Sequence, residues 1–341
     1  MRILLAVDGS RISQATTKSV VVQARPENDL ILVVHVVDAM TNLLPDMRAY
    51  YPGVELGRNA QRKIAEEIVY DAKELLGSAH LSATEDIEWG DPKSKIIDVA
   101  VEWHADLIVL GSHGKTTLER VLTGSVADYV MRHAPCSVEL VRRSYAHEGL
   151  KRDAGTSSDH IDRILVAIND TRASEMAVRF LSKQIHSERT EVRVFHAIQP
   201  LDVLLSREMG GYDPWLEQVL EDQTRDAEKL VSKVAHEFFE KGIKVSMRTL
   251  EGDARSKILE ESREWKADLL VIGSHGRKGF ARFLSGSLSE ALAHHSTCSV
   301  EIVRSSESDI AAEAVEGADG CLQKMNLGPS GNRVSCPYVG A

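Results

Sequence analysis

The segment WGDPKSKIIDVAVEWHADLIVLGSHG, residues 89–114, returns later in the chain as EGDARSKILEESREWKADLLVIGSHG, residues 251–276. The two segments align without a gap. Their identical pairs include Gly90/Gly252, Asp91/Asp253, Ser94/Ser256, Trp103/Trp265 and Asp106/Asp268. Similarity of this extent indicates an internal repeat, and a repeat decides how every other segment is interpreted.

The similarity continues on both sides of this segment. RILLAVDGS at 2–10 matches RILVAINDT at 163–171, LVVHVVD at 32–38 matches RVFHAIQ at 193–199, and CSVELVR at 136–142 matches CSVEIVR at 298–304. We therefore expect two domains of one kind, residues 1–143 and 161–304. A polar linker, residues 144–160, would join them. The tail, residues 305–341, has no counterpart and is expected to be poorly ordered.

Within each copy, short apolar or β-branched runs alternate with longer stretches of helical periodicity. Runs such as ILLAVD and DLIVLG are apolar throughout, as in strands that are buried on both faces. Residues 59–77 carry apolar side chains every three or four positions, which is typical of a helix. This alternation predicts an α/β fold in which an open parallel sheet has helices on both faces.

The composition argues against some classes of partner and indicates where the protein is located. The chain has 341 residues, 43% of them hydrophobic, with 41 basic and 51 acidic residues and a formal charge of −10. This charge argues against a nucleic-acid or anionic membrane partner. The four cysteines form no CxxC pair, which favours a reducing compartment. The apolar runs are too short for a signal peptide or a membrane span, so a cytoplasmic protein is expected.

A Gly-Lys-Thr triplet at Gly114 to Thr116 looks like the end of a phosphate-binding P-loop. That motif needs a glycine five residues before the Gly-Lys pair, and Val109 stands there. The glycines have another spacing, Gly111-x2-Gly114-x9-Gly124-Ser125. Gly111 ends one predicted strand and Gly124 precedes a predicted helix, so the loop between them would lie where parallel sheets bind ligands.

On this spacing the chain resembles the universal stress protein family, in its ATP-binding form and in a tandem arrangement. The second copy repeats the signature as Gly273, Gly276, Gly286 and Ser287. The resemblance implies two Rossmann-like domains of the adenine nucleotide alpha hydrolase-like kind, each an open five-stranded parallel sheet with strand order 3-2-1-4-5. It also implies pairing of the last strands, residues 137–143 and 299–304, so that the chain is an internal pseudo-dimer. A further homodimer is possible.

The resemblance also implies a nucleotide site in each copy. In the first copy, Asp8 would contact the ribose or adenine, the backbone of Val36 the adenine edge, and the remaining positions the phosphates: Gly111, Gly114, Gly124, Ser125 and Val126. The corresponding positions of the second copy are Asn169, Ala197, Gly273, Gly276, Gly286, Ser287 and Leu288. Asn169 replaces the carboxylate of Asp8 with a neutral amide, which puts nucleotide binding by the second copy in question.

Basic residues lie between the glycines, Lys115 in the first copy and Arg277 in the second. They would offset phosphate charge, or they are ordinary surface charges. His113 and His275 are interpreted as loop residues rather than metal ligands. Cys136 and Cys298 are expected to be small buried side chains, and Asp106 and Asp268 to be structural.

The leading hypothesis is a stress-response module that binds ATP, or ADP or AMP, with Mg²⁺ on the phosphates and little or no turnover. No nucleophile or general base with an orienting partner is apparent near the loop. One alternative is a slow ATPase or another nucleotide-using enzyme, although DGSRIS at residues 8–13 poorly matches the SGGxDS loop of adenylating enzymes. The other alternative is a nucleotide-free interaction scaffold.

Overall fold

The computed structural model describes residues 1–38, 53–113, 123–142, 161–185, 189–199, 214–274 and 287–304. These residues belong to one compact unit that ends at Arg304. The predicted linker, residues 144–160, and tail, residues 305–341, lie outside the described residues. The exact boundaries of the two copies therefore stay a prediction.

Strands and helices alternate in both copies, as the sequence pattern predicts. The first copy contains β1 (Arg2–Ala6), α1 (Arg11–Gln23), β2 (Leu30–Asp38), α2 (Gly53–Ser78), β3 (Ala83–Gly90), α3 (Pro92–Glu102), β4 (Leu107–Gly111), α4 (Ser125–His133) and β5 (Ser137–Val141). The second contains β6 (Arg163–Ala167), α5 (Arg172–Gln184), β7 (Glu191–Ile198), α7 (Pro214–Phe239), β8 (Lys244–Glu251), α8 (Ala254–Glu264), β9 (Leu269–Gly273), α9 (Ser287–His295) and β10 (Ser299–Val303).

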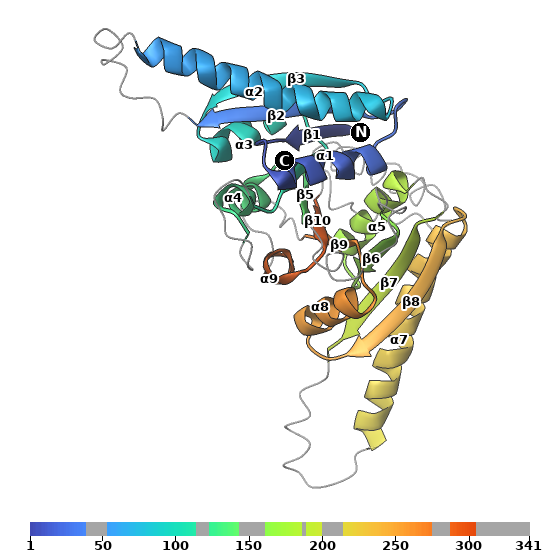
Figure 1. Cartoon of the computed structure of the whole chain (residues 1–341). Helices are drawn as coiled ribbons and strands as arrows, with labels where there is room; N and C mark the ends of the chain where they lie inside the picture. The colour runs from blue at the N-terminus through green and yellow to red at the C-terminus, as the bar shows by residue number, and fades with distance from the viewer. Residues whose placement is uncertain are drawn as a thin grey trace, which may run out of the picture. The chain divides into compact units, whose positions relative to one another are not determined.

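The strands form one ten-stranded sheet in the order β3-β2-β1-β4-β5-β10-β9-β6-β7-β8 (Figure 1). Each half has the expected order 3-2-1-4-5, and all pairs within a half are parallel. The expected pairing of the last strand of each copy is confirmed. β5 and β10 pair antiparallel, so the two sheets are joined at the edge that each would otherwise leave open.

The same local signals begin equivalent helices in the two copies. Asp91 accepts a hydrogen bond from the backbone N–H of Ser94 and caps α3, and Asp253 caps α8 through Ser256 in the same way. Asp106 and Asp268 have the structural role expected of them. Their carboxylates accept the backbone N–H groups that begin the neighbouring strands β1 and β6.

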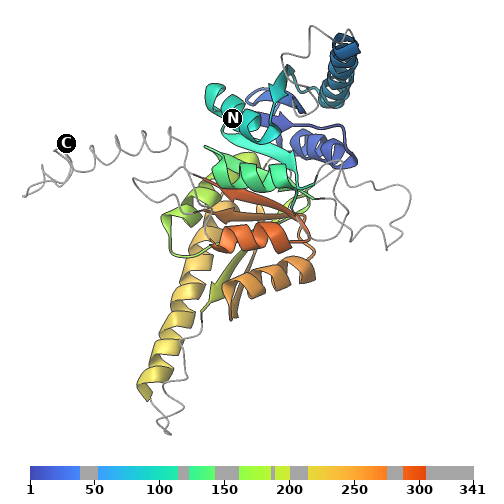
Figure 2. The ribbon, with the colours of Figure 1, turned by 90° about the vertical axis from the view of Figure 1, so that its left-hand side faces the viewer.

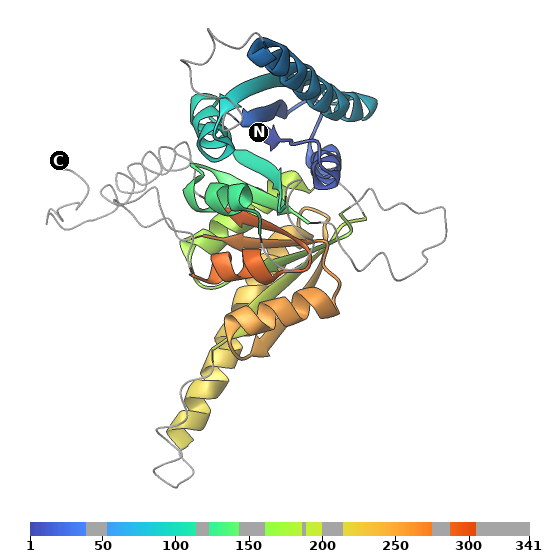
Figure 3. The ribbon, with the colours of Figure 1, turned by 60° about the vertical axis from the view of Figure 1, so that its left-hand side comes forward.

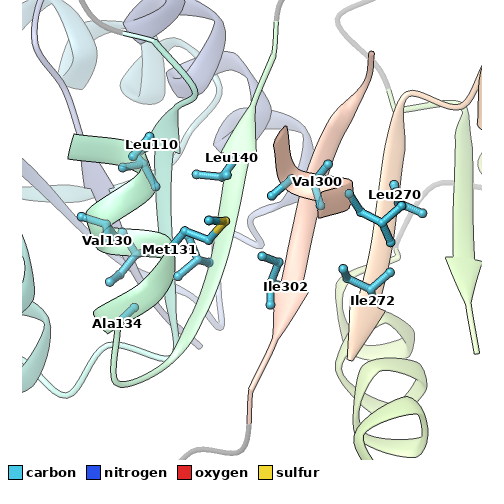
Figure 4. Packing of buried hydrophobic residues seen from close by; sticks show 14 of the residues in the cluster. Leu110, Val130, Met131, Ala134, Leu140, Leu270, Ile272, Val300 and Ile302 are labelled. Atoms are coloured by element: carbon cyan, nitrogen blue, oxygen red, sulfur yellow. The ribbon is translucent and has the colours of Figure 1, made fainter. Parts of the chain in front are cut away.

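Helices cover both faces of the sheet, but the core is continuous across only one of them. On that face α3, α4, α9 and α8 follow one another along the sheet (Figures 2 and 3), and their apolar side chains form a single cluster that includes residues of both copies. Leu140 and Val300, a cross-strand pair of β5 and β10, lie in it (Figure 4). On the other face, α1 with α2 and α5 with α7 cover two separate clusters.

Two arginines connect the copies in a reciprocal way at the seam, which is the antiparallel pair of β5 and β10. Arg142 follows β5, and its guanidinium donates hydrogen bonds to the carbonyls of Ser296, at 2.8 Å, and Ala293 at the end of α9. Arg304 follows β10 and donates to the carbonyls of Ala134 and Met131 at the end of α4. Each arginine therefore satisfies carbonyls that the other copy's helix leaves without an intrahelical partner.

We expect Arg304→Ala to lower the free energy of unfolding by about 2–3 kcal/mol, because two buried carbonyls lose a charged donor. Arg304→Lys should restore only part of this loss, since an ammonium group lacks the planar fork of a guanidinium. Urea denaturation of the full chain measures both. Arg225→Ala is the control, because the Arg225 side chain is 57% exposed and should cost under about 0.5 kcal/mol. Equal effects at the two sites would contradict this role for Arg304.

In the portion of the chain that the structure describes, every helix is too short or too polar to cross a membrane.

Candidate functional site

The first copy brings its candidate residues together at the carboxyl edge of β1, β2 and β4. The strand register pairs Ala6 with Val34 on one side and with Leu110 on the other. Two residues further along each strand, Asp8, Val36 and Ser112 are therefore level with one another. This edge contains the point at which the strand order reverses, where open α/β sheets bind ligands.

Asp8 is held by the turn that leads into α1. Its Oδ1 accepts a hydrogen bond from the backbone N–H of Ser10 at 2.9 Å, and its own N–H donates to the Ser13 hydroxyl at 3.1 Å. Gly9 between them has a φ of 76°, which glycine adopts without strain. Among the described residues no donor contacts Oδ2 of Asp8, so one carboxylate oxygen is available to a ligand.

The beginning of α4 is attached to the end of β4. The N–H of Ser112 donates to the carbonyl of Val141 at 2.9 Å, and the N–H of Gly124 donates to the carbonyl of Ser112 at 2.7 Å. Gly124 is the N-cap of α4 and provides no side-chain cap. Ser125 is exposed and Val126 half-buried, so the first turn of α4 presents backbone N–H groups and a positive dipole end.

Gly111 and Gly273 are required for a reason that the spacing did not reveal. A Cβ on Gly111 would overlap the side chain of Ile12 in α1, and a Cβ on Gly273 would overlap the backbone carbonyl of Ala173 in α5. These glycines therefore permit a helix to approach the strand end closely. This contact is within the protein, so a ligand is not needed to explain either glycine.

The second copy has the same arrangement of strand ends, but Asn169 stands in place of Asp8. The register places Asn169, Ala197 and Ser274 level with one another at the edge of β6, β7 and β9. Oδ1 of Asn169 accepts the hydroxyls of Thr171 at 2.5 Å and Ser174 at 2.7 Å. The amide oxygen is thus occupied by the protein itself, unlike Oδ2 of Asp8.

The remaining predicted residues divide into two groups. Ser287 and Leu288 begin α9 and are exposed. The others, Gly114, Lys115, Gly276, Arg277 and Gly286, lie outside the described residues, as does His275.

Several repeated polar residues near the site are structural. Nδ1 of His35 lies 2.7 Å from the carbonyl oxygen of Val7, and Nδ1 of His196 lies 2.8 Å from that of Ile168. The two cysteines are buried, as expected; burial raises the pKa of Cys136 to about 12 and that of Cys298 to about 11. Their thiols therefore stay protonated near neutral pH.

Sequence reasoning missed the serines that shape the two turns. Ser13 and Ser174 each accept the backbone N–H of the residue at the end of the first strand. The available signal was the recurrence of Asp8-x4-Ser13 as Asn169-x4-Ser174. In the described part of the chain no cluster of three or more His, Cys, Asp or Glu side chains could hold a metal ion.

A family model described as the Universal stress protein family matches residues 1–142 and 160–304. The chain belongs to the universal stress protein family. A universal stress protein of Mycobacterium tuberculosis is 28% identical over 310 residues, which cover 89% of this chain and 97% of that protein. The two segments that the family model matches confirm the tandem arrangement of this universal stress protein.

Solved structures agree with the fold. A universal stress protein from Archaeoglobus fulgidus covers 89% of this chain and 98% of its own, with 19% identity and a TM-score of 0.58. A universal stress protein family member from Arabidopsis thaliana, solved with AMP bound, covers 43% of this chain and 94% of its own, with 16% identity and a TM-score of 0.33. At that similarity its ligand adds no weight to an assignment for this universal stress protein.

Proposed function

We propose that the first copy binds an adenine nucleotide at the carboxyl edge of β1, β2 and β4, and that occupancy of this site acts as a signal in a stress response. The observation that supports it most strongly is the pairing of two complementary groups at one edge. Oδ2 of Asp8 is an acceptor suited to a hydroxyl or amine, and the uncapped first turn of α4 provides donors suited to phosphate.

The residues present fit the parts of a nucleotide. Asp8 would accept a ribose hydroxyl or the adenine amine, and the backbone of Val36 would contact the adenine edge. Gly124, Ser125 and Val126 would donate backbone N–H groups to phosphate, with Gly111, Gly114 and Lys115 beside them. Mg²⁺ would accompany ATP through the phosphates and water, since its preferred ligands are phosphate, carboxylate and water oxygens. ATP, ADP and AMP share the adenosine that Asp8 and Val36 would hold.

Nucleotide binding by the second copy is proposed to be weaker. Gly273, Gly276, Arg277, Gly286, Ser287 and Leu288 would form its phosphate site, with Ala197 at the adenine edge. Asn169, however, offers no carboxylate, and its amide oxygen already accepts two hydroxyls. A ligand hydroxyl would have to displace one of them. Little or no turnover is proposed for either site, and the cytoplasm is the proposed location, because Cys136 and Cys298 are free thiols.

The decisive experiment is isothermal titration of ATP with Mg²⁺ into the full chain, compared with Asp8→Ala and Gly124→Val. We expect one site per chain for the wild type and at least a tenfold loss of affinity in each variant, equivalent to about 1.4 kcal/mol or more. Asn169→Ala is the matched control, which removes the equivalent side chain of the second copy and should leave the site of the first copy unchanged.

Three outcomes would change the proposal. Two equivalent sites per chain would show that the second copy binds as well as the first. Release of phosphate during the titration would favour the slow ATPase. No binding of ATP, ADP or AMP would overturn nucleotide binding and favour the interaction scaffold.

A further inference from the structure

Two glutamates face each other in the middle of the seam between the copies. Glu139 of β5 and Glu301 of β10 are directly opposed partners in the antiparallel pairing, a position in which Cβ atoms are about 4.5–5.5 Å apart. Both residues are 0% exposed. Their strand neighbours, such as Leu140 and Val300, point to the continuous apolar core on the opposite face.

The groups around this pair are neutral. Glu139 accepts hydrogen bonds from the Ser19 hydroxyl at 2.7 Å and from the Gln23 amide at 2.9 Å, both on α1. Glu301 accepts one from the Gln184 amide of α5, at 3.3 Å. The strand partners on the far sides are apolar: β4 places Val109 beside Glu139, and β9 places Val271 beside Glu301.

Among the described residues, the surroundings of the pair hold no cation that could balance two charges. Ser19, Gln23 and Gln184 are the polar side chains that contact the carboxyl groups, and the only charged group facing either glutamate within the described residues is the other glutamate. Two carboxylates on directly opposed residues that are both fully buried, with no counter-ion among the described residues, cannot both be ionised at modest cost.

A second observation, the hydrogen bonding of Glu301, also favours one protonated carboxyl group in the pair over two carboxylates. Oε1 of Glu301 is fully buried and has no hydrogen-bond partner among the described residues. A carboxylate oxygen accepts hydrogen bonds only, whereas a protonated carboxyl group also donates one. Protonation of one glutamate would provide a donor inside a cluster otherwise rich in acceptors.

We propose that Glu139 and Glu301 hold a proton between them across the seam at neutral pH, and that its release to solvent at alkaline pH weakens the joint between the two copies. In the protonated state one side chain is a neutral carboxylic acid and the other a carboxylate that can accept its O–H. Deprotonation leaves two adjacent buried anions on strands that hold the halves of the sheet together. The pair thereby acts as a pH-sensitive latch, by which we mean that the seam is more stable while the proton is bound than after it is lost. This effect is independent of nucleotide binding.

The electrostatics agree with this geometry. Burial raises the pKa of both carboxyl groups, and the pKa of Glu301 rises to about 8, with the charge of Glu139 as the next cause. In the unfolded chain a glutamate has a pKa of about 4.3. The folded state thus binds more protons in the interval between these values, so the pair's contribution to stability is complete at acid pH and is lost as the pH rises through about 8.

Infrared difference spectroscopy in D₂O on the full wild-type chain tests the proton directly. We expect a band of a protonated buried carboxyl group at neutral pH, absent from the Glu139→Gln/Glu301→Gln double variant and lost from the wild type as the pH rises. Absence of such a band at neutral pH from the folded wild type would overturn the proposal without any variant having to fold.

Urea denaturation as a function of pH tests the latch. The wild-type midpoint should fall between about pH 5 and about pH 9, whereas the Glu139→Gln/Glu301→Gln double variant should lose this fall and Glu301→Gln should keep only the smaller part that comes from the burial of Glu139. Glu264→Gln, at an exposed position of α8, is the control and should follow the wild type. Parallel curves for the wild type and Glu301→Gln would contradict the latch.

A bound cation is the competing explanation of the same oxygens. The denaturation series is therefore repeated at constant ionic strength with choline in place of Na⁺ and K⁺. An unchanged midpoint is expected. A midpoint that rises with K⁺ or Na⁺ in the wild type, and not in Glu301→Gln, would replace the shared proton with a cation site.

Discussion

Replacing Glu261 with alanine is expected to lower the free energy of unfolding by about 3 kcal/mol, because it leaves the half-buried guanidinium of Arg193 without its buried carboxylate partner. Glu261 is 2% exposed, and its Oε1 lies 2.7 Å from Nη1 of Arg193. The guanidinium of Arg193 also lies 4.4 Å from the ring centroid of Trp265. Once Glu261 is removed, Arg193 would remain charged beside the apolar core.

The first copy supplies the replacement that should repair this loss. The repeat alignment places Leu32 at the position of Arg193 and Val99 at that of Glu261, and both are buried in the core. The double variant Arg193→Leu/Glu261→Val should therefore be as stable as the wild type or more stable, since apolar pairs often replace buried ion pairs without loss.

A double-mutant cycle by urea denaturation measures both effects, with Arg193→Leu and Glu261→Val as the single variants. We expect the two single losses to add up to far more than the loss in the double variant. Simple additivity, with the double variant the least stable of all, would contradict the prediction, because it would show that Arg193 and Glu261 do not stabilise each other and that the apolar pair does not compensate for their loss.

Gly273→Ala is expected to destabilise the protein by about 3 kcal/mol or more, at the upper end of what an added methyl group costs in a packed site. The new Cβ would overlap the carbonyl of Ala173 and come within 2.9 Å of the backbone nitrogen of Ser174. Backbone atoms at the start of α5 cannot rotate away, so the helix itself must move from the sheet.

Gly111→Ala is the matched control, because the same methyl group meets a side chain instead. Its Cβ would overlap Cγ2 of Ile12, a half-buried side chain that can be displaced or shortened without moving the backbone of α1. We expect a loss of about 1–2 kcal/mol, largely recovered in Gly111→Ala/Ile12→Ala. Thermal or urea denaturation compares the two glycines. Equal losses would contradict the distinction between backbone and side-chain contact.

Local patterns predicted the elements of the fold well. Apolar runs identified the strands, three-and-four spacing identified α2, and Asp91 with Ser94 recurs as Asp253 with Ser256 at the starts of α3 and α8. These features depend on residues close together in the chain, so they can be read without knowing the fold. The strand order came from the family resemblance, and the sheet confirms it.

The candidate site was predictable only in part. The sequence placed Gly111 at a strand end, the family resemblance assigned Asp8 and Val36 to the site, and the register brings the three strand ends to one edge. Spacing alone assigned Gly111 and Gly273 to a ligand loop, whereas their immediate contacts are Ile12 and Ala173. Those contacts join segments about a hundred residues apart, so no local sequence pattern predicts them.

The sequence by itself determined that one α/β unit occurs twice, because an internal repeat and a hydrophobic period depend only on the order of the residues along the chain. The tertiary structure alone decided which buried residues meet. Glu139 and Glu301 each look like one polar residue in an apolar strand, and only the antiparallel pairing of β5 with β10 makes them neighbours. The physical reason is that the charge and packing of a buried group depend on side chains that folding brings to it from distant parts of the chain.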